Sequence, residues 1–341
     1  MISTDPQDPA HDELDAEPGA EAETRPFTVP PGLHGQRLDR ALALLVPEFS
    51  RSYLVQLLDA GAVRLEGATA TKASHKVRAG DAGSIELRPT PQSQAFLPED
   101  IPLQVVHEDE HLLVIAKPAG LVVHPAPGNW SGTLLNALLG RDVAARSLPR
   151  AGIVHRLDKD TSGLMLVART RTAMDRLVAM IAAREVTRQY LALAHRPWEG
   201  AARRRIDAHI GRDPRNRLRM AVVDSHHPGK PAATVAELLE NCAQGCAVRC
   251  TLETGRTHQI RVHLAHIGHP LVADPTYGGA PAAGLQRQAL HAFQLALAHP
   301  VTGAPLAFHA PLPEDLRQAW SAWGLRYNEA AWLPGQPAAA P

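Results

Sequence analysis

The stretch GIVHRLDKDTSGL, residues 152–164, organises the rest of the sequence. The apolar pair Ile153-Val154 lies near its start, and the run LMLVA, residues 164–168, predicts a buried strand directly after it. Charged side chains held between apolar runs must be paired or functional, because burying an unpaired charge is costly. Asp, Lys, Thr, Ser and Gly are also common in surface turns. The stretch alone therefore leaves two alternatives, a functional loop and an ordinary turn.

Residues 155–164 have the pattern His-Arg-Leu-Asp-x-x-Thr-Ser-Gly-Leu. Two further blocks come later in the chain, namely RQY at 188–190 and TGRTHQIRVH at 254–263. In these blocks the sequence resembles the RluA/RluD family of RNA pseudouridine synthases. Residues 128–139 resemble the large-subunit rRNA branch of that family, which is RluD-like. Three ordered blocks, covering roughly residues 100–315, are far more specific than one short motif. The resemblance implies an isomerase that converts uridine to pseudouridine in 23S rRNA.

The same resemblance assigns roles to individual side chains. It makes Asp158 the nucleophile, Arg261 its ion-pair partner and Tyr190 the aromatic ring that stacks on the uracil. An arginine within ~4–6 Å favours the ionised form of an aspartate. Arg156 matches the family residue that fills the space left when the target base flips out of its stack. Arg256 is the less favoured partner for Asp158, and contact with an RNA phosphate is its alternative role.

The chemistry implied by the resemblance needs no cofactor, because isomerisation exchanges no electron or group with another molecule. A carboxylate nucleophile can split such a difficult reaction into two easier steps. Attack on the anomeric carbon and formation of a glycal both remain open from the sequence. No glutamate completes a His-Glu-x-x-His pattern, so we expect no metal. The histidines considered for a metal site are His155, His258, His263, His266 and His269.

Charge is unevenly distributed along the 341 residues, although the formal net charge is zero. Residues 1–24 hold 8 acidic side chains and no Lys or Arg, so 35 basic residues face 27 acidic ones (35 less 8) in the remainder. A basic remainder is compatible with an RNA partner. The acidic composition and the shortage of large apolar residues predict a disordered tail over residues 1–25.

No apolar run approaches the ~20 residues that span a bilayer. The start of the sequence also lacks the basic and apolar regions of a signal peptide. We therefore expect a cytoplasmic protein without membrane contact, and a monomer. The expected partner is large-subunit (23S) rRNA or a pre-ribosomal particle.

A small unit is predicted over residues 35–88, with two amphipathic helices followed by short strands. Its pattern resembles the alpha-L RNA-binding domain named after a protein of the small ribosomal subunit. The resemblance implies that arginines on the helix pair contact phosphates and give affinity that does not depend on RNA sequence. The candidates in this unit are Arg37, Arg40, Arg51 and Arg64.

The remaining chain is expected to form a linker over residues 89–100, a catalytic domain over 101–325 and a loose tail over 326–341. In the catalytic domain, strands and helices alternate without a regular βαβ rhythm. That arrangement favours the α+β class, with a mixed and largely antiparallel sheet.

The target within 23S rRNA is expected to be the helix 69 stem-loop, with other 23S or tRNA sites as the alternative. A non-catalytic rRNA-binding or ribosome-assembly factor is a second alternative. A metal-dependent nuclease or a glycosidase is a third. Glycosidases usually need two carboxylates that flank the bond, and Asp160 is the near neighbour of Asp158 that could supply the second.

Overall fold

The computed structural model describes residues 23–88, 95–216, 219–224 and 227–327. The chain divides into two compact units between Leu97 and Pro98. Within the described ranges, no helix is both long enough and apolar enough to cross a bilayer. Most of the predicted acidic tail and of the predicted C-terminal tail, together with residues 89–94 of the predicted linker, lies outside the described residues.

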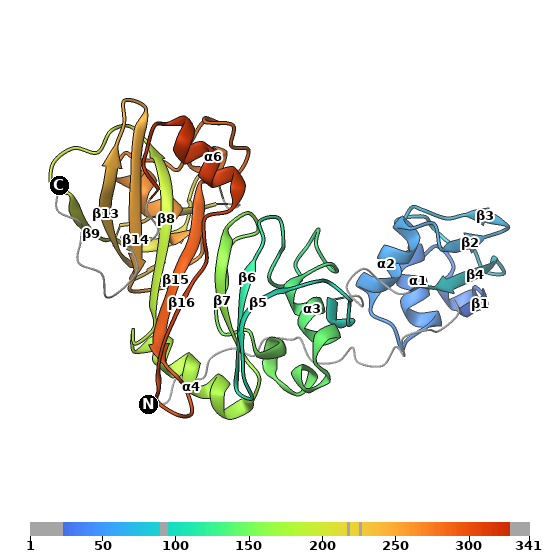
Figure 1. Cartoon of the computed structure of the whole chain (residues 1–341). Helices are drawn as coiled ribbons and strands as arrows, with labels where there is room; N and C mark the ends of the chain where they lie inside the picture. The colour runs from blue at the N-terminus through green and yellow to red at the C-terminus, as the bar shows by residue number, and fades with distance from the viewer. Residues whose placement is uncertain (1–22, 89–94, 217–218, 225–226, 328–341) are drawn as a thin grey trace, which may run out of the picture. The chain divides into compact units, whose positions relative to one another are not determined.

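The first unit packs two helices against a four-stranded antiparallel sheet of strand order β1-β4-β2-β3 (Figure 1). Ser50 caps the second helix by accepting a hydrogen bond from the backbone N–H of Tyr53, as its position before an amphipathic run predicts. The elements are β1 (Glu23–Thr28), α1 (Leu38–Leu45), α2 (Arg51–Asp59), β2 (Val63–Leu65), β3 (Ala68–Thr69) and β4 (Ala82–Leu87).

The expectation of disorder up to residue 25 is wrong for its last three residues. Strand β1 begins at Glu23, which pairs with Leu87, and the pairing continues to Thr28 opposite Ala82. Backbone pairing with β4 therefore outweighs the polar composition of this segment, because strand formation depends strongly on context.

The second unit is built on a nine-stranded sheet of order β5-β6-β7-β15-β8-β14-β13-β9, with β16 paired to β15 (Figure 1). Every pairing is antiparallel except that of β7 with β15. The predicted α+β class with a mixed, largely antiparallel sheet is confirmed. The strands are β5 (Gln104–Glu108), β6 (Leu112–Lys117), β7 (Ser162–Ala168), β8 (Thr187–His195), β9 (Arg203–Asp207), β13 (Ala233–Asn241), β14 (Gly245–Leu252), β15 (Leu290–Ala298) and β16 (Pro305–His309).

Four helices cover the two faces of this sheet, and a small sheet of order β11-β10-β12 lies beside α5. On one face, α3 and α5 pack over alternate residues of β6, β7, β8 and β14. On the other face, α4 packs over β6 and β7, and α6 packs over β8. These elements are α3 (Leu134–Arg141), α4 (Arg171–Ala182), α5 (Gln259–His266), α6 (Glu314–Ala322), β10 (Ile210–Arg212), β11 (Met220–Val222) and β12 (Gly229–Lys230).

The ordered C-terminal part of this unit extends past the predicted boundary at residue 325. The Tyr327 hydroxyl accepts a hydrogen bond from the backbone N–H of Leu312 at 3.2 Å, and its ring packs near Trp320 of α6. An aromatic ring that buries against a helix fixes the chain there.

Candidate active site

The motif that opens the sequence forms a loop, residues 154–161, that enters β7. Just before the loop, Ile153 bridges to Val167 of the same strand. Just after it, Gly163 has a φ of +116°, and a Cβ there would overlap the backbone of Ala292 in β15. Glycine is therefore required where the parallel pair β7 and β15 begins. The loop is fixed at both of its ends by the sheet.

Backbone groups inside the loop are also anchored. The carbonyl of Asp158 accepts a hydrogen bond from the N–H of Thr161 at 3.1 Å. The guanidinium of Arg287 donates to the carbonyl of Asp160 at 3.0 Å. These contacts hold the backbone that carries the Asp158 side chain.

Lys117, at the end of β6, contributes a third anchor. Its side chain is 1% exposed, and Nζ donates to the carbonyls of Pro118, Leu121 and Lys159, each at 2.9 Å. Burial lowers the Lys117 pKa to about 8. Three acceptors match the three N–H groups of an ammonium. With a pKa of about 8, Lys117 carries its charge at pH 7. Its side chain therefore connects the loop to the chain that follows β6.

Asp158 and Arg261 form an ion pair inside the second unit. Arg261, on α5, donates through Nη1 to Oδ2 of Asp158 at 3.0 Å. Asp274, fully buried, accepts from Nε and Nη2 of the same guanidinium at 2.7 and 2.9 Å. Despite burial, hydrogen bonds to Asp274 and the charges of both carboxylates raise the Arg261 pKa. The arginine therefore stays charged between two carboxylates.

His258 and Tyr277 complete this side of the site. Nε2 of His258 lies 3.8 Å from Oδ1 of Asp158, and Nδ1 is hydrogen-bonded to the Tyr277 hydroxyl at 2.8 Å. His258 has a φ of +57°, in the left-handed region, which is uncommon for a residue other than glycine. Burial lowers its pKa, so the ring is neutral at pH 7. The Arg261 guanidinium lies 5.0 Å from the centre of the Tyr277 ring.

Tyr190 lies on β8, where it pairs with Cys250 of β14 and Ala292 of β15. The side chain is 5% exposed, and burial raises its pKa to about 12. Arg188 lies two residues earlier on the same face of the strand and is also buried. The phenol is therefore neutral at pH 7 and has a cationic neighbour.

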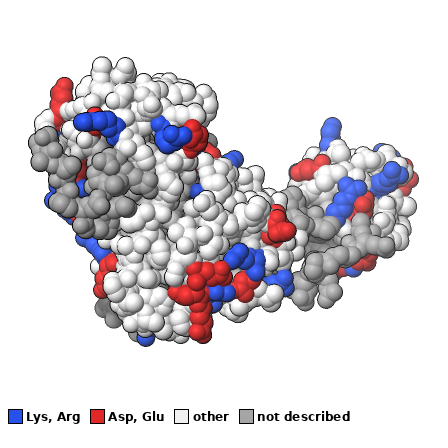
Figure 2. All heavy atoms as spheres, viewed as in Figure 1, with Lys and Arg blue, Asp and Glu red and all other residues white. Residues whose placement is uncertain are grey.

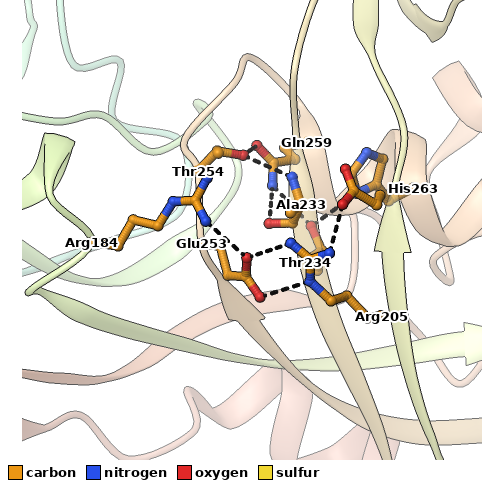
Figure 3. A network of polar contacts seen from close by, with 9 residues as sticks. Arg184, Arg205, Ala233, Thr234, Glu253, Thr254, Gln259 and His263 are labelled. Carbon is orange, nitrogen blue, oxygen red and sulfur yellow. Dashed lines mark hydrogen bonds and ion pairs between the residues drawn. The ribbon is translucent and has the colours of Figure 1, made fainter.

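The segment after β14 is held by the Gln259 side chain (Figure 3). Its Oε1 accepts from the Thr254 hydroxyl at 2.7 Å and from the Arg256 N–H at 2.9 Å. Its Nε2 donates to the Ala233 carbonyl and to the Thr234 hydroxyl. One buried amide thus connects the TGRT block to β13 and fixes the start of α5.

Glu253, next to this network, accepts from two arginines in Figure 3. Arg205 approaches it at 2.8 Å, and the exposed Arg184 approaches it at 3.3 Å. On the face of the molecule seen in Figure 2, several Lys and Arg groups lie beside Asp or Glu. Basic side chains on this face are partly neutralised by neighbouring acids.

A cavity of about 460 Å³ opens at these residues, a size within the usual range of ligand pockets. Five of the predicted site residues line it: Asp158, Tyr190, Arg261, Arg156 and Arg256. Arg156 is exposed, and Arg256 is bound through Nε to the Pro231 carbonyl at 3.1 Å. The structure brings Asp158 to Arg261, as predicted from the motif match, and leaves Arg256 as a side chain at the rim.

His155 packs beneath the loop. Its Nε2 accepts a hydrogen bond from the backbone N–H of Leu166 in β7 at 2.9 Å. Burial lowers the His155 pKa to about 3, so the ring is neutral and its remaining proton is on Nδ1. Residues 156–158 are a loop rather than a strand. Arg156 and Asp158 therefore share the cavity through loop geometry and not through the two-residue period of a strand.

Among the described residues, no group of three or more His, Cys, Asp or Glu side chains is placed to hold a metal ion. The His263 ring, for example, is hydrogen-bonded to the Thr234 hydroxyl and the Ala208 carbonyl. His269 stacks on Trp198.

Two of the predicted RNA-contacting arginines of the first unit, Arg37 and Arg51, contact one buried carboxylate. Asp39, 1% exposed, accepts from Arg37 at 3.1 Å and from Arg51 at 2.5 Å. Hydrogen bonds, that from Arg37 foremost, lower the Asp39 pKa to about 2. Arg40 is exposed. Asp39 fixes the direction of two guanidinium groups that remain about half exposed.

Five side chains at the cavity or its loop were not assigned a role from the sequence. Lys117 lies between an apolar run and a proline, and Arg188 is in the RQY block beside Tyr190. His258 was weighed as a metal ligand. The segment with Asp274 and Tyr277, ADPTY, carries an acid between apolar and proline residues. That pattern indicates a functional carboxylate only once Arg261 is known to need a second carboxylate as its partner.

Comparison with known proteins defines the class of this chain. Residues 111–266 match the model of the RNA pseudouridylate synthase family, and residues 36–82 match the S4 domain. A relative from Xanthomonas campestris, named ribosomal large subunit pseudouridine synthase D, is 48% identical over 87% of this chain and 92% of its own length. The chain belongs to the RNA pseudouridine synthase family, and its first unit contains an S4 domain.

Other relatives carry the same name. Proteins from Neisseria meningitidis serogroup B and Escherichia coli carry the same name, are each 45% identical, and match over 89% and 83% of this chain. Among solved structures, human RNA pseudouridylate synthase domain containing 1 matches with a TM-score of 0.52 and 29% identity, over 66% of this chain and 89% of its own. The predicted family and enzyme class are confirmed.

Proposed function

We propose that this protein isomerises uridine to pseudouridine in the 23S rRNA of the large ribosomal subunit, at the helix 69 stem-loop. The relatives named ribosomal large subunit pseudouridine synthase D support the rRNA substrate. One observation carries the chemistry, namely a partly exposed Asp158 carboxylate held by a buried Arg261 at the wall of a cavity. A protein that only bound RNA would not need this pair.

Asp158 is proposed as the group that starts the reaction. Its carboxylate, which accepts a hydrogen bond from Arg261, attacks the anomeric carbon of the flipped-out uridine or removes the neighbouring sugar proton to form a glycal. In either route, the electron pair of the bond between C1′ and N1 passes to the uracil. Carboxylate nucleophiles divide difficult substitutions in this way.

The uracil then turns within the cavity and bonds through C5 to C1′. In the covalent route this bond displaces the carboxylate from C1′, and in the glycal route the carboxyl group returns its proton to C2′, so both routes regenerate the free carboxylate. The proton on C5 is lost and N1 gains one, so no atom or electron is exchanged overall. Tyr190 is proposed to stack on the uracil and to relay the C5 proton, since its phenol faces the cavity beside Asp158. No cofactor enters this scheme.

Binding of the RNA is assigned to arginines outside this centre. Arg156 fills the position of the extruded base, and Arg256 contacts a phosphate at the rim. Arg37, Arg40 and Arg51 contact the backbone of the RNA through the first unit. Phosphate contacts give affinity and position without reading sequence. We propose that the protein does this as a monomer in the cytoplasm.

Pseudouridine mapping tests the proposal. The 23S rRNA of cells that lack this protein is mapped, and the mapping is repeated after wild type or Asp158→Asn is added back. Loss of pseudouridine in helix 69, restored by wild type alone, supports the proposal. Loss only at other 23S positions, or only in tRNA, would reassign the substrate. Unchanged modification of every rRNA and tRNA would favour the assembly-factor alternative.

A further inference from the structure

Arg188 is a buried cation to which the mechanism above gives no role. The residue is 4% exposed, and its Nε is enclosed without a hydrogen-bond acceptor. Within the described part of the chain, no carboxylate forms an ion pair with it. Arg261, buried to a similar degree, is instead held by both Asp158 and Asp274. Arg188 and Arg261 thus line the same cavity, and only Arg261 has carboxylate partners.

The guanidinium of Arg188 lies on the cavity wall, which also includes Asp158 and Tyr190. It shares a face of β8 with Tyr190, two residues away. Gly255 approaches it from the TGRT block, and a Cβ on that glycine would lie 2.9 Å from Nη1 of Arg188. The absence of a side chain at Gly255 therefore leaves room for the guanidinium.

The neighbours of Arg188 do not neutralise its charge. His155 is neutral, and part of the lowering of its pKa comes from Arg188 itself. Tyr190 is neutral at pH 7. An unpaired buried charge is costly unless a ligand compensates it. The missing partner is therefore an anion, or a group that becomes anionic, inside the cavity.

We propose that Arg188 is a catalytic residue that binds a carbonyl oxygen of the target uracil and stabilises the negative charge that develops on it. That charge appears when the electron pair of the C1′–N1 bond moves to the ring. Arg188 donates hydrogen bonds and transfers no proton, so the balance of the reaction is unchanged. The site takes the anionic base of a pyrimidine nucleoside.

A phosphate is the less suitable ligand for this position. Phosphates of RNA are hydrated and run along the surface, where the exposed Arg156 and Arg184 line the same cavity. Arg188 lies within the wall beside the ring of Tyr190, where a flat base is proposed to stack. Preorganised donors aimed at developing charge in a site that excludes water are among the largest contributions to catalysis.

This inference rests on the proposed pseudouridine synthase reaction. Single-turnover rates are measured with saturating enzyme on a helix 69 RNA, together with RNA affinity at several salt concentrations. Arg188→Met is expected to lower the saturating rate by about 10²–10³-fold, with RNA affinity within about twofold and the same salt dependence. Arg188→Lys, which keeps the charge, is expected to retain at least about tenfold more rate than Arg188→Met. Arg171→Met, an exposed surface arginine on α4, is the control and keeps wild-type values.

Several results would overturn the assignment. One is a wild-type rate for Arg188→Met. Another is weakened RNA binding with a salt slope smaller by about one and an unchanged saturating rate, which identifies a phosphate contact. A third is a lowered melting temperature for Arg188→Met, because removal of an unpaired charge should not destabilise the fold. If that variant does not fold, Arg188→Gln is compared with Arg188→Lys, and equal rates for these two contradict a role of the charge.

Failure of the substrate assignment has a separate signature, since wild type would then leave helix 69 RNA unmodified. In that case the same variants are compared on the RNA that wild type does modify, found by mapping.

Discussion

Asp274 holds the Arg261 guanidinium through two hydrogen bonds, and Arg261 in turn holds Asp158 through a third. The bidentate contact fixes the plane of the guanidinium, which point charges cannot do. Asp274 therefore positions the proposed nucleophile without touching the substrate.

Asp274→Asn is expected to lower the single-turnover rate on the order of 100-fold, because a small misplacement of the reacting group costs about that much. RNA affinity should stay near the wild-type value. Asp175→Asn, which removes the partner of Arg171 on the surface of α4, is the control. A wild-type rate for Asp274→Asn would show that Arg261 needs no second carboxylate.

Asp158→Asn is expected to reduce the rate by at least about 10⁴-fold, the scale of losing a nucleophile. The fold should be intact, since Arg261 remains bound to Asp274. Asp160→Asn, in the same loop, should retain activity. Product formation is measured at saturating enzyme, and thermal unfolding is recorded for all three proteins. Equal loss in the two variants would instead indicate a pair of carboxylates, as in a glycosidase.

Lys117→Met is expected to lower the free energy of unfolding by about 3 kcal/mol, because three carbonyls in a part-buried site lose their donor. The carbonyl of Lys159 is one of them, so activity should fall as well. Urea unfolding at pH 7 measures the first effect. Arg146→Met, an exposed change outside the site, is the control. Undiminished stability would mean that water replaces the ammonium at all three carbonyls.

Acid should destabilise the second unit through His155. Its pKa is about 3 in the folded protein against an ordinary value of 6.5. Between these values the unfolded chain binds a proton that the folded chain does not, so the free energy of unfolding falls as the pH falls, by at most about 1.4 kcal/mol per pH unit from this group.

His155→Gln tests this dependence, because its carboxamide oxygen can accept the Leu166 N–H without titrating. Unfolding is measured from pH 7 to pH 4 for both proteins. The variant should lose less stability than wild type over that range. Parallel curves would assign the acid sensitivity to other histidines, such as His291, whose pKa burial lowers to about 4.

Arg40→Ala should weaken RNA binding and reduce the slope of log affinity against log salt concentration by about one. The rate at saturating RNA should be unchanged, because Arg40 lies in the first unit. Arg25→Ala is the control, since Arg25 is paired with both Glu23 and Glu48. An unchanged salt slope for Arg40→Ala would remove this residue from the RNA-binding surface.

Much of the fold follows from local patterns in the sequence. The buried run after the central motif is β7, and Ser50 caps α2 as its position predicts. The ion pair between Asp158 and Arg261 was expected from two matched blocks. In the first two cases the determining residues are neighbours in sequence, and the ion pair was expected only because both blocks match one family.

The rest of the site depends on contacts that no local pattern contains. Lys117 reaches the Lys159 carbonyl only because β6 lies beside β7. Asp274 meets Arg261 after the turn that follows α5. The lack of an ion-pair partner for Arg188 depends on the positions of all the side chains that surround it in the folded structure. Strand β1 was missed because its pairing partner, β4, lies far along the chain.

Because of the place of β15 in the sheet, the catalytic domain can be completed only late in the synthesis of the chain. β15 lies between β7, which follows the Asp158 loop, and β8, which carries Tyr190, yet it is made long after both. Residues 23–88, in contrast, contain the whole sheet of the first unit. Domains fold as units, and those synthesised first fold first. During synthesis the chain therefore completes its S4 domain early, and can hold RNA before its catalytic cavity exists.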